Sequence, residues 1–338
     1  MKQTKKKLPF KFTYNKALLL ICVVLFLAIG FVRPIFFSGN YISETIKQVV
    51  EIGIMVLPVT FIIISGGIDF SMNASMILSA IVSSIVFKYT NSFVAILVAL
   101  IIGLVCGLIN GILIAKLKLP PLVTTLATMY LFKGIAEGLT MGITSVGASV
   151  ASYPAATFLG TGKLLGIPTQ FWLLAILAVL FYIVLSKTYY GRYIYAVGLN
   201  EQAAKYSGIQ VERLKIALYV LGGFVYSIAG LVYLGRFSSL RYDSADPITL
   251  QVLTTVVLGG TSIAGGFGDI KGSVLGIVII AILKSGMNVL FIPQTTQKIV
   301  LGLILLISLM IFEVIRSRTE KKKKVGSLKA AQEASGKA

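Results

Sequence analysis

The chain has 338 residues, of which 57% are hydrophobic and 13% are charged. Soluble domains average about 45–50% apolar and about 25% charged residues, so the composition excludes an ordinary soluble protein and indicates a polytopic membrane protein. The net charge is +19, from 31 Lys and Arg against 12 Asp and Glu. These basic residues lie between and beyond apolar runs, where they act as orientation signals and meet anionic lipid headgroups. We therefore expect membrane lipids, and no nucleic acid, as partners.

The residue types that most enzymes need are scarce in this sequence. It has no histidine, and its two cysteines, Cys22 and Cys106, both lie inside apolar runs. The commonest metal ligand and the usual general base are therefore missing. Isolated cysteines in apolar runs are typical of small core residues. We expect no metal site and no catalytic residue, which argues against a membrane enzyme.

The N-terminal segment 1–16 carries six lysines and precedes an apolar run at 17–32. Such a start fits either a secretory signal peptide or a first membrane span. No small-x-small cleavage site follows the run, which favours a retained span with a cytoplasmic N-terminus.

Nine further apolar runs bring the expected number of spans to ten. They are 47–65, 71–88, 93–117, 122–139, 171–186, 215–234, 250–263, 273–290 and 298–315. Several are shorter than the roughly 20 residues that a full crossing requires. Short, glycine-broken segments are tolerated only where protein or a water-filled cavity satisfies the backbone. The runs predict an all-α polytopic membrane protein with a single transmembrane domain over 17–315.

The distribution of basic residues orients these spans. With the N-terminus inside, 22 basic residues fall on the cytoplasmic side and seven on the outer side. The positive-inside rule therefore favours ten spans with both termini in the cytoplasm, and it places the loop 187–214 there as well. Segment 316–338, which contains four consecutive lysines, is expected to be a disordered basic tail beside the inner leaflet.

The fourth and ninth spans resemble each other. Gly103 and Gly107, then a lysine and a proline, match Gly272 and Gly276, then a lysine and a proline. A five-span repeat has an odd number of crossings, so its two halves would insert upside down relative to each other, as in many transporters. The alternative is that Gly-x-x-x-Gly is only a common helix-packing pattern. The sequence leaves both open.

A polar break separates the second and third spans. Gly66 and Gly67 free the backbone, and Asp69 and Ser71 can accept hydrogen bonds from the start of the next helix. An acidic residue at membrane depth is a functional candidate by default. Asp69 is interpreted either as a cap that holds the break or as a direct contact for the transported molecule, and the cap is favoured because it satisfies the carboxylate.

Further charged residues lie within spans. Lys133 and Glu137 are four apart, so they share a helix face and can pair. Glu51 lies about one turn into the second span and can reach the outer interface or a polar pocket. Together with Asp69, these acids are the case for a proton-driven carrier.

A glycine-rich re-entry lies between the eighth and ninth spans. Its expected helix-breaking or path-lining residues are Gly259, Gly260, Thr261, Gly265 and Gly266, to be added to those of the first break. Gly266-Phe267-Gly268 only begins like a dinucleotide fingerprint, and Gly162-Lys163 lacks the Ser or Thr of a phosphate loop. We therefore expect no cofactor in this chain, and ATP and Mg²⁺ to reside on a partner subunit if ATP drives it.

The loop 191–209 is a long polar interruption with the composition of a compact helix–turn element. Together with the motifs at 65–71 and 259–272, in the same order, it resembles the permease subunits of sugar ABC importers, the ribose, xylose, galactose and autoinducer-2 class. The likeness extends over nearly the whole chain from the second span onward. It implies a bacterial plasma-membrane protein with a ten-helix fold like that of the vitamin B12 importer permease.

The resemblance also implies partners and a coupling site. Two permease subunits, as a homodimer or heterodimer, would work with two ATPase subunits and an extracytoplasmic substrate-binding protein. The loop would dock on the ATPase through a helix shaped by Gly191, Arg192, Ala196, Gly198, Asn200, Ala203, Ala204 and Gly208. This chain departs from the family pattern at Asn73, at Thr249-Leu250 and at Thr254-Thr255, which fits either a different ligand or one half of a heteromeric pair.

The expected function is import of a sugar or sugar-like molecule as the permease subunit of an ABC importer. Two alternatives stay open on the sequence. One is a permease for branched-chain amino acids or nucleosides, and the other is a proton-coupled secondary transporter that uses Asp69, Glu51 or Glu137.

Overall fold

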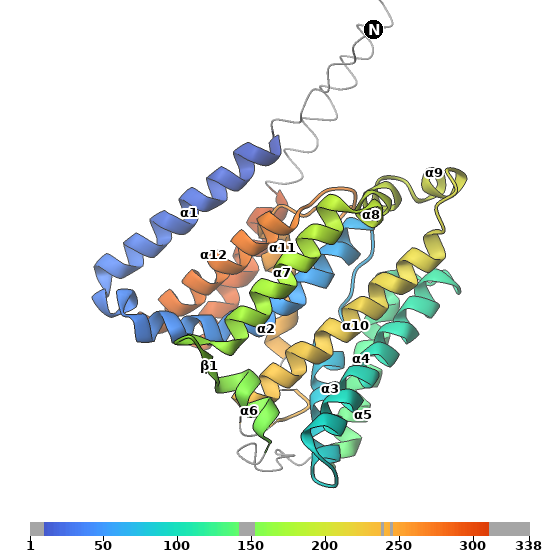
Figure 1. Ribbon diagram of the computed structural model, residues 1–338. Helices are drawn as coiled ribbons and strands as arrows, with labels where there is room; N and C mark the ends of the chain where they lie inside the picture. The colour runs from blue at the N-terminus through green and yellow to red at the C-terminus, as the bar shows by residue number, and fades with distance from the viewer. Residues whose placement is uncertain (1–9, 142–152, 238–239, 244–245, 311–338) are drawn as a thin grey trace, which may run out of the picture.

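The computed structural model describes residues 10–141, 153–237, 240–243 and 246–310, as a bundle of long helices (Figure 1). The basic segment 1–9 and the expected tail at 316–338 lie outside the described residues. In chain order the elements are α1 (Phe10–Val32), η1 (Pro34–Phe37), α2 (Gly39–Ile64), α3 (Met72–Phe87), α4 (Ser92–Ala115), α5 (Pro121–Thr140), α6 (Pro154–Thr161), β1 (Lys163–Leu164), β2 (Ile167–Pro168), α7 (Thr169–Lys187), α8 (Tyr189–Leu199), α9 (Glu201–Tyr206), α10 (Val211–Arg236), α11 (Asp246–Leu258) and α12 (Ile270–Val289). A further apolar helix covers Gln294–Met310.

Each of the ten expected spans overlaps a helix, and residues 311–315 of the last span lie outside the described residues. Among the described residues, six helices are long and apolar enough to cross a membrane, namely α1, α2, α4, α7, α10 and α12. Three shorter apolar helices, Met72–Phe87, Ile248–Leu258 and Gln294–Met310, cover three more of the expected ranges. The remaining range corresponds to α5, whose length is 20 residues. The prediction of an all-α polytopic membrane protein is therefore confirmed in its general form.

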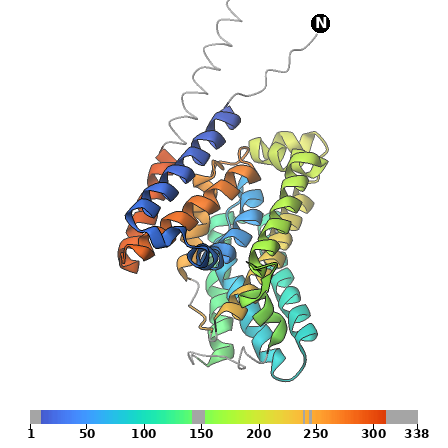
Figure 2. The same ribbon diagram turned by 60° about the vertical axis from the view of Figure 1, so that its left-hand side comes forward.

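Two helices form the centre of the bundle. Every residue of α2 from 49 to 64 is buried, because this stretch is apolar except for Glu51 and Thr60 and neighbours pack on all its sides. Helix α2 packs against α7, α10, α11 and α12, and α10 packs against α2, α3, α4 and α6. Helix α1 lies at one side of the bundle, alongside α12 (Figures 1 and 2).

Glycine brings α4 and α10 close together. A Cβ atom added at Gly107 would lie 2.2 Å from the carbonyl oxygen of Tyr219, and one at Gly103 would lie 2.3 Å from that of Gly223. Gly276 makes the same kind of contact with Thr255 of α11, and Gly272 makes it with Gly259, directly after that helix. Both Gly-x-x-x-Gly pairs are therefore sites where helix backbones touch, as small-residue motifs do in membranes.

The boundaries of two expected spans were wrong. Helix α2 begins at Gly39, eight residues before the expected position, because Ser38 accepts a hydrogen bond from the amide of Tyr41 and starts the helix there. The expected span at 250–263 ends at Leu258, since Gly259 and Gly260 follow and Gly260 adopts a left-handed φ of 87°. Between spans five and six, the described residues include α6 and a short antiparallel pair, β1 and β2.

The close approach of α4 and α10 gives a stability prediction. Gly107→Ala on α4 places a methyl group against the backbone of α10, whereas Gly134→Ala on α5 meets nothing within 4 Å. Both changes gain the same helix propensity, so the difference between them reports packing. We expect Gly107→Ala to be less stable than Gly134→Ala by about 1–3 kcal/mol, measured by thermal unfolding of the purified protein in detergent. Equal melting temperatures would contradict the close contact.

Candidate functional site

Three segments far apart in sequence meet at one end of the bundle. They are the end of α2 with residues 65–67, the end of α8, and the loop 259–269, and we call their meeting point the glycine junction. The amide of Gly266 donates to the carbonyl of Ile64 at 2.8 Å. The hydroxyl of Tyr195 on α8 donates to the carbonyl of Gly268 at 2.6 Å. All three motifs singled out in the sequence thus contribute to one place.

Glycine is required where the three segments touch. A Cβ atom at Gly198 would lie 1.7 Å from the carbonyl oxygen of Ile64 and 2.6 Å from the amide nitrogen of Gly266. Gly265 adopts φ +82°, and a Cβ there would lie 3.0 Å from the Cα of Gly66. The contact is therefore backbone against backbone. Such a contact cannot be compressed, so a shift of α8 must move its neighbours.

The loop 191–209 is the compact helix–turn element that its composition indicated. Asn200 separates α8 from α9, and its side chain caps α9 by accepting the amide of Ala203 at 2.9 Å. Gly208, with φ +84°, ends the element. Ala204 is buried in a small apolar cluster with Val197 and Val211, which fastens α9 to the start of α10.

The eight residues expected to shape this element divide by exposure. Four of them face outward and are open to a partner, namely Arg192, Asn200, Ala203 and Gly208. Gly191 and Ala204 are buried, and Ala196 and Gly198 are half-buried. The inward group holds the element on the bundle, so only the outward group offers side chains to a partner subunit.

The sequence prediction missed Tyr195, which joins α8 to the loop 259–269. Burial raises the pKa of its hydroxyl, and the nearby Asp269 carboxylate raises that pKa further, so the group stays a hydrogen-bond donor. Its position was available from spacing, because Gly191, Tyr195 and Gly198 fall at helical intervals on one face of α8. The other missed contact is Tyr14 of α1, which donates to the carbonyl of Leu258 at 2.8 Å. Tyr14 lies more than 240 residues from that partner, and no local pattern signals it.

The break at 65–71 is held by a buried polar network. The carboxylate of Asp69 accepts the amide of Ser71 at 2.8 Å and its hydroxyl at 2.6 Å, just before α3 begins. Asn110 of α4 donates to the Ser71 hydroxyl at 2.7 Å, and Thr128 of α5 donates to Asn110 at 2.7 Å. Tyr219 of α10 donates to the carbonyl of Ile68 at 3.1 Å. The break is thus fixed by α4, α5 and α10, and its carboxylate is engaged in the cap.

The glycine-rich loop is packed just as closely. A Cβ on Gly259 would meet the backbone of Gly272 at 2.7 Å, and one on Gly260 would meet the ring of Tyr14 at 2.5 Å. Asp269 caps α12 by accepting the amide of Gly272. Thr261 is fully buried, and its hydroxyl has no hydrogen-bond partner among the described residues. The loop therefore connects α11, α12 and α1 to the glycine junction.

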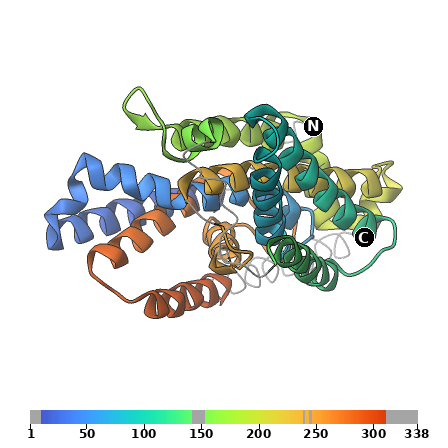
Figure 3. The same cartoon turned by 90° about the horizontal axis from the view of Figure 1, so that it is seen from below.

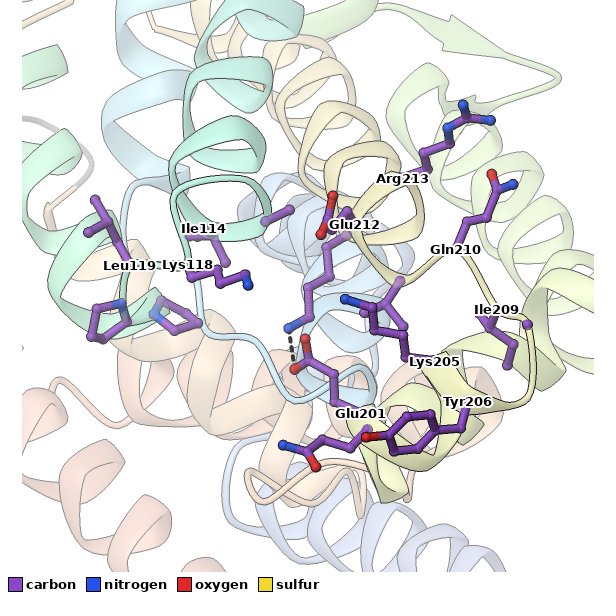
Figure 4. Close-up of a pocket in the computed structure, with 17 residues that line it drawn as sticks. Ile114, Lys118, Leu119, Glu201, Lys205, Tyr206, Ile209, Gln210, Glu212 and Arg213 are labelled. Atoms are coloured by element: carbon purple, nitrogen blue, oxygen red, sulfur yellow. Dashed lines mark hydrogen bonds and ion pairs between the residues drawn. The ribbon is translucent and has the colours of Figure 1, made fainter.

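A cleft of about 1150 Å³ opens beside the junction. It lies between the turn that joins α4 to α5, helix α9 and the start of α10. In Figure 4, Glu201, Lys205 and Tyr206 of α9 lie on one side, and Ile114, Lys118 and Leu119 lie across from them. Lys215 of α10 forms an ion pair with Glu201 at 2.6 Å across this region. The outward residues of α9 thus lie at the rim of a hollow on the same end of the molecule.

The charged residues within spans have partners. Glu51 forms an ion pair with Arg236 of α10, with 2.8 Å between Oε1 and Nε. Lys133 lies over the ring of Tyr242, 5.8 Å from its centroid. The Glu137 carboxylate also acts on Tyr242 and raises the pKa of its hydroxyl. Lys133 and Glu137 thus converge on a tyrosine beyond α10, and no sequence pattern links them to it.

No cluster of metal-ligating side chains occurs among the described residues. The glycine junction is an outward helical element in close backbone contact with two helix breaks of the bundle. Such an arrangement is suited to passing movement from a partner into the spans.

The sequence matches the family model described as the permease component of branched-chain amino acid transport systems, over residues 41–309. The chain belongs to this permease family. It is 36% identical to the ribose import permease protein RbsC of Bacillus subtilis over 291 residues, which is 85% of this chain and 89% of that protein. It is 32% identical to the autoinducer 2 import system permease protein LsrD of an Enterobacter species over 306 residues, covering 89% and 93% of the two chains.

A third relative is the L-arabinose transport system permease protein AraH of Escherichia coli, at 40% identity over 193 residues, which is 57% of this chain and 58% of that protein. No solved structure matches the chain.

The Tyr195 contact can be tested by amide exchange. Tyr195→Phe removes the hydrogen bond to Gly268 and keeps the ring, which should destabilise the local closed state by about 0.5–1.5 kcal/mol. We expect the amides of 259–269 to exchange roughly two- to tenfold faster, measured by hydrogen–deuterium exchange with mass spectrometry.

Tyr193→Phe is the matched control, because that side chain is exposed on the same helix. Unchanged exchange in the loop of Tyr195→Phe would show that the hydroxyl does not hold it.

Proposed function

We propose that this chain is the transmembrane permease subunit of an ABC importer that moves a sugar or sugar-like small molecule into a bacterial cell. Family membership and the likeness to ribose and autoinducer 2 permeases over most of the chain support the solute class. The observation that carries the mechanism is the backbone contact of Gly198 with Ile64 and Gly266. It joins the outward helical element to the ends of two spans.

The mechanism follows from that contact. A separate ATPase subunit, which holds ATP and Mg²⁺, docks on the outward residues of α8 and α9 beside the cleft. Closure of its nucleotide sites displaces α8. Because Gly198 abuts Ile64 and Gly266 without an intervening side chain, α2 and the loop 259–269 move with α8. The chain contributes no catalytic residue and transmits movement only.

The remaining partners and the orientation follow from the same function. A second permease subunit, identical or different, would complete the pathway, and an extracytoplasmic binding protein would deliver the solute at the opposite end. The glycine junction, the cleft and the start of α1 would face the cytoplasm, with both termini on that side of the plasma membrane. The charge asymmetry of the loops supports this orientation.

We also propose ten spans arranged as two inverted five-helix repeats, as in the vitamin B12 importer permease. Helix packing supports this arrangement. In the first half, α3 and α4 pack on each other and on α10 of the second half. In the second half, α11 and α12 pack on each other and on α2 of the first half. Matching each span with the span five later pairs α2 with α10, α3 with α11 and α4 with α12. Under this matching the two sets of packing contacts are equivalent.

A branched-chain amino acid permease is the second candidate, and the description of the matching family model favours it. A nucleoside permease has the same architecture, so direct transport separates the three. No such observation favours a proton-coupled carrier, since Glu51 is paired with Arg236 and Asp69 with Ser71.

The function is tested by solute uptake into membrane vesicles in which the orientation of the protein is known. Vesicles that contain this chain, its ATPase and its binding protein should accumulate at least one labelled solute from a panel of sugars and sugar derivatives with ATP, and accumulation should stop when ATP is withheld. Leucine and uridine are the comparison solutes. Uptake by this chain alone without ATP, or collapse of uptake by a protonophore at constant ATP, would overturn the proposal.

Residues of the glycine junction and residues of the outward face should give different defects when they are changed. Gly198→Ala clashes with the junction while leaving the outward face intact, so the ATPase should still copurify and uptake-coupled ATP hydrolysis should fall at least tenfold, a loss of about 1.4 kcal/mol or more in coupling. Ala203→Trp changes only the exposed face of α9, so copurification itself should fall while the melting temperature stays unchanged. Normal coupled turnover in Gly198→Ala would refute transmission through the junction.

A further inference from the structure

A group of charged side chains lies at the end of the bundle opposite the glycine junction. It comprises Glu51 on α2, Arg236 at the end of α10 and Lys284 on α12. Glu51 precedes Ile64 of the junction by 13 residues of continuous helix, which is about 20 Å. We call these three residues the outer charge cluster. Charged groups at such positions in a membrane bundle are costly and mark functional sites.

The contacts of the cluster leave its charges unbalanced. Arg236 pairs with Glu51 at 2.8 Å and also donates to the carbonyl of Lys47 at 3.1 Å. Lys284 donates to the neutral Gln251 side chain at 3.3 Å, and its charge acts on both Glu51 and Arg236. Among the described side chains, two cations therefore share one carboxylate.

The ammonium group of Lys47 does not add to this excess of positive charge, because it is paired with Glu44 at 2.7 Å. An uncompensated cation in a low-dielectric interior is unfavourable, and one additional negative charge would neutralise it.

Exposure shows which charges face an arriving molecule. The Glu51 side chain is 1% exposed, whereas that of Arg236 is 19% exposed. Lys284 is half-buried. The acid therefore lies beneath the two cations, and the cations are the groups accessible from this end.

Neutral amides lie one helical turn farther out. Gln48 precedes Glu51 by three residues on α2, and Asn288 follows Lys284 by four on α12, so each amide shares the face of its charged neighbour. Asn288 donates to Gln48 at 3.1 Å and accepts from Gln297 at 2.9 Å. Amides can exchange such bonds for the hydroxyl groups of a polyol.

We propose that the outer charge cluster recognises a sugar acid, with Lys284 and Arg236 binding its carboxylate and the amides of Gln48, Asn288 and Gln251 binding its hydroxyls. This assignment rests on the proposed import function and names its solute class. A carboxylate brings the single negative charge that the cluster lacks, whereas a phosphate monoester brings about 1.5 to 2 at neutral pH. A neutral sugar leaves the extra cation uncompensated.

The test is ligand-dependent thermal stability of the full chain in lipid nanodiscs. D-ribonate, D-ribose and sodium chloride are compared at equal concentration and ionic strength. A bound ligand stabilises the folded state in proportion to its occupancy. D-ribonate should raise the melting temperature progressively with concentration, and D-ribose and sodium chloride should not.

Four variants locate the effect. Lys284→Gln should weaken the response to D-ribonate at least tenfold in concentration, and Lys284→Arg should retain it. Lys47→Gln is the matched control with a paired cation, and it should respond like the parent chain. Gln251→Glu places the missing negative charge inside the protein, so it should fold at least as stably as the parent and lose the response to D-ribonate.

Equal shifts with D-ribose and D-ribonate, or an unchanged response in either Lys284→Gln or Gln251→Glu, would overturn the assignment. The measurement needs neither ATP nor the ATPase. Failure here therefore leaves ATP-driven import standing, and failure of ATP-driven uptake leaves this binding result standing.

Discussion

The structure depends on one contact in which main chain meets main chain. Gly198 of α8 lies against the carbonyl of Ile64 and the amide of Gly266, and those two groups are themselves hydrogen-bonded at 2.8 Å. A single methyl group at position 198 would separate all three segments. Every other feature of this end of the bundle keeps that contact in place, including the cap by Asn200, the burial of Ala204 and the Tyr195 hydrogen bond to Gly268.

The contact is effective because the segments behind it are rigid. On one side, the break after α2 is tied to α4 and α5 through Ser71, Asn110 and Thr128, and to α10 through Tyr219. On the other, the loop 259–269 is tied to α1 through Tyr14 and to α12 through Asp269. A displacement of α8 thus reaches two groups of spans on opposite sides of the central pair α2 and α10 (Figure 3). The network around Asp69 is satisfied internally, which explains a buried carboxylate without assigning it to a solute.

Much of this arrangement could be predicted from the sequence, for a physical reason. Apolar runs of membrane length identify spans directly, and the three glycine-containing motifs stand out because glycine and polar residues are conspicuous in an apolar chain. The order of the motifs did not reveal that Gly66, Gly198 and Gly265 meet at one point. Their contact depends on how α2, α8 and α11 are placed by the whole bundle. The Arg236 partner of Glu51 was hidden in the same way, because 185 residues separate them.

The two ends of the central helices differ in the kind of contact they make, and each kind suits a different function. At the glycine junction the contacts are between backbone atoms, which transmit displacement but offer a solute no chemical selectivity. At the outer charge cluster the contacts are between charged and amide side chains, which discriminate solutes but yield under force. Helices α2, α10 and α12 extend between both ends. A group that binds at one end and a displacement applied at the other therefore act on the same helices, and any coupling free energy between the two is reciprocal. In the importer that we propose, this reciprocity lets the arrival of solute and the closure of the ATPase favour the same arrangement of spans without a direct contact between them.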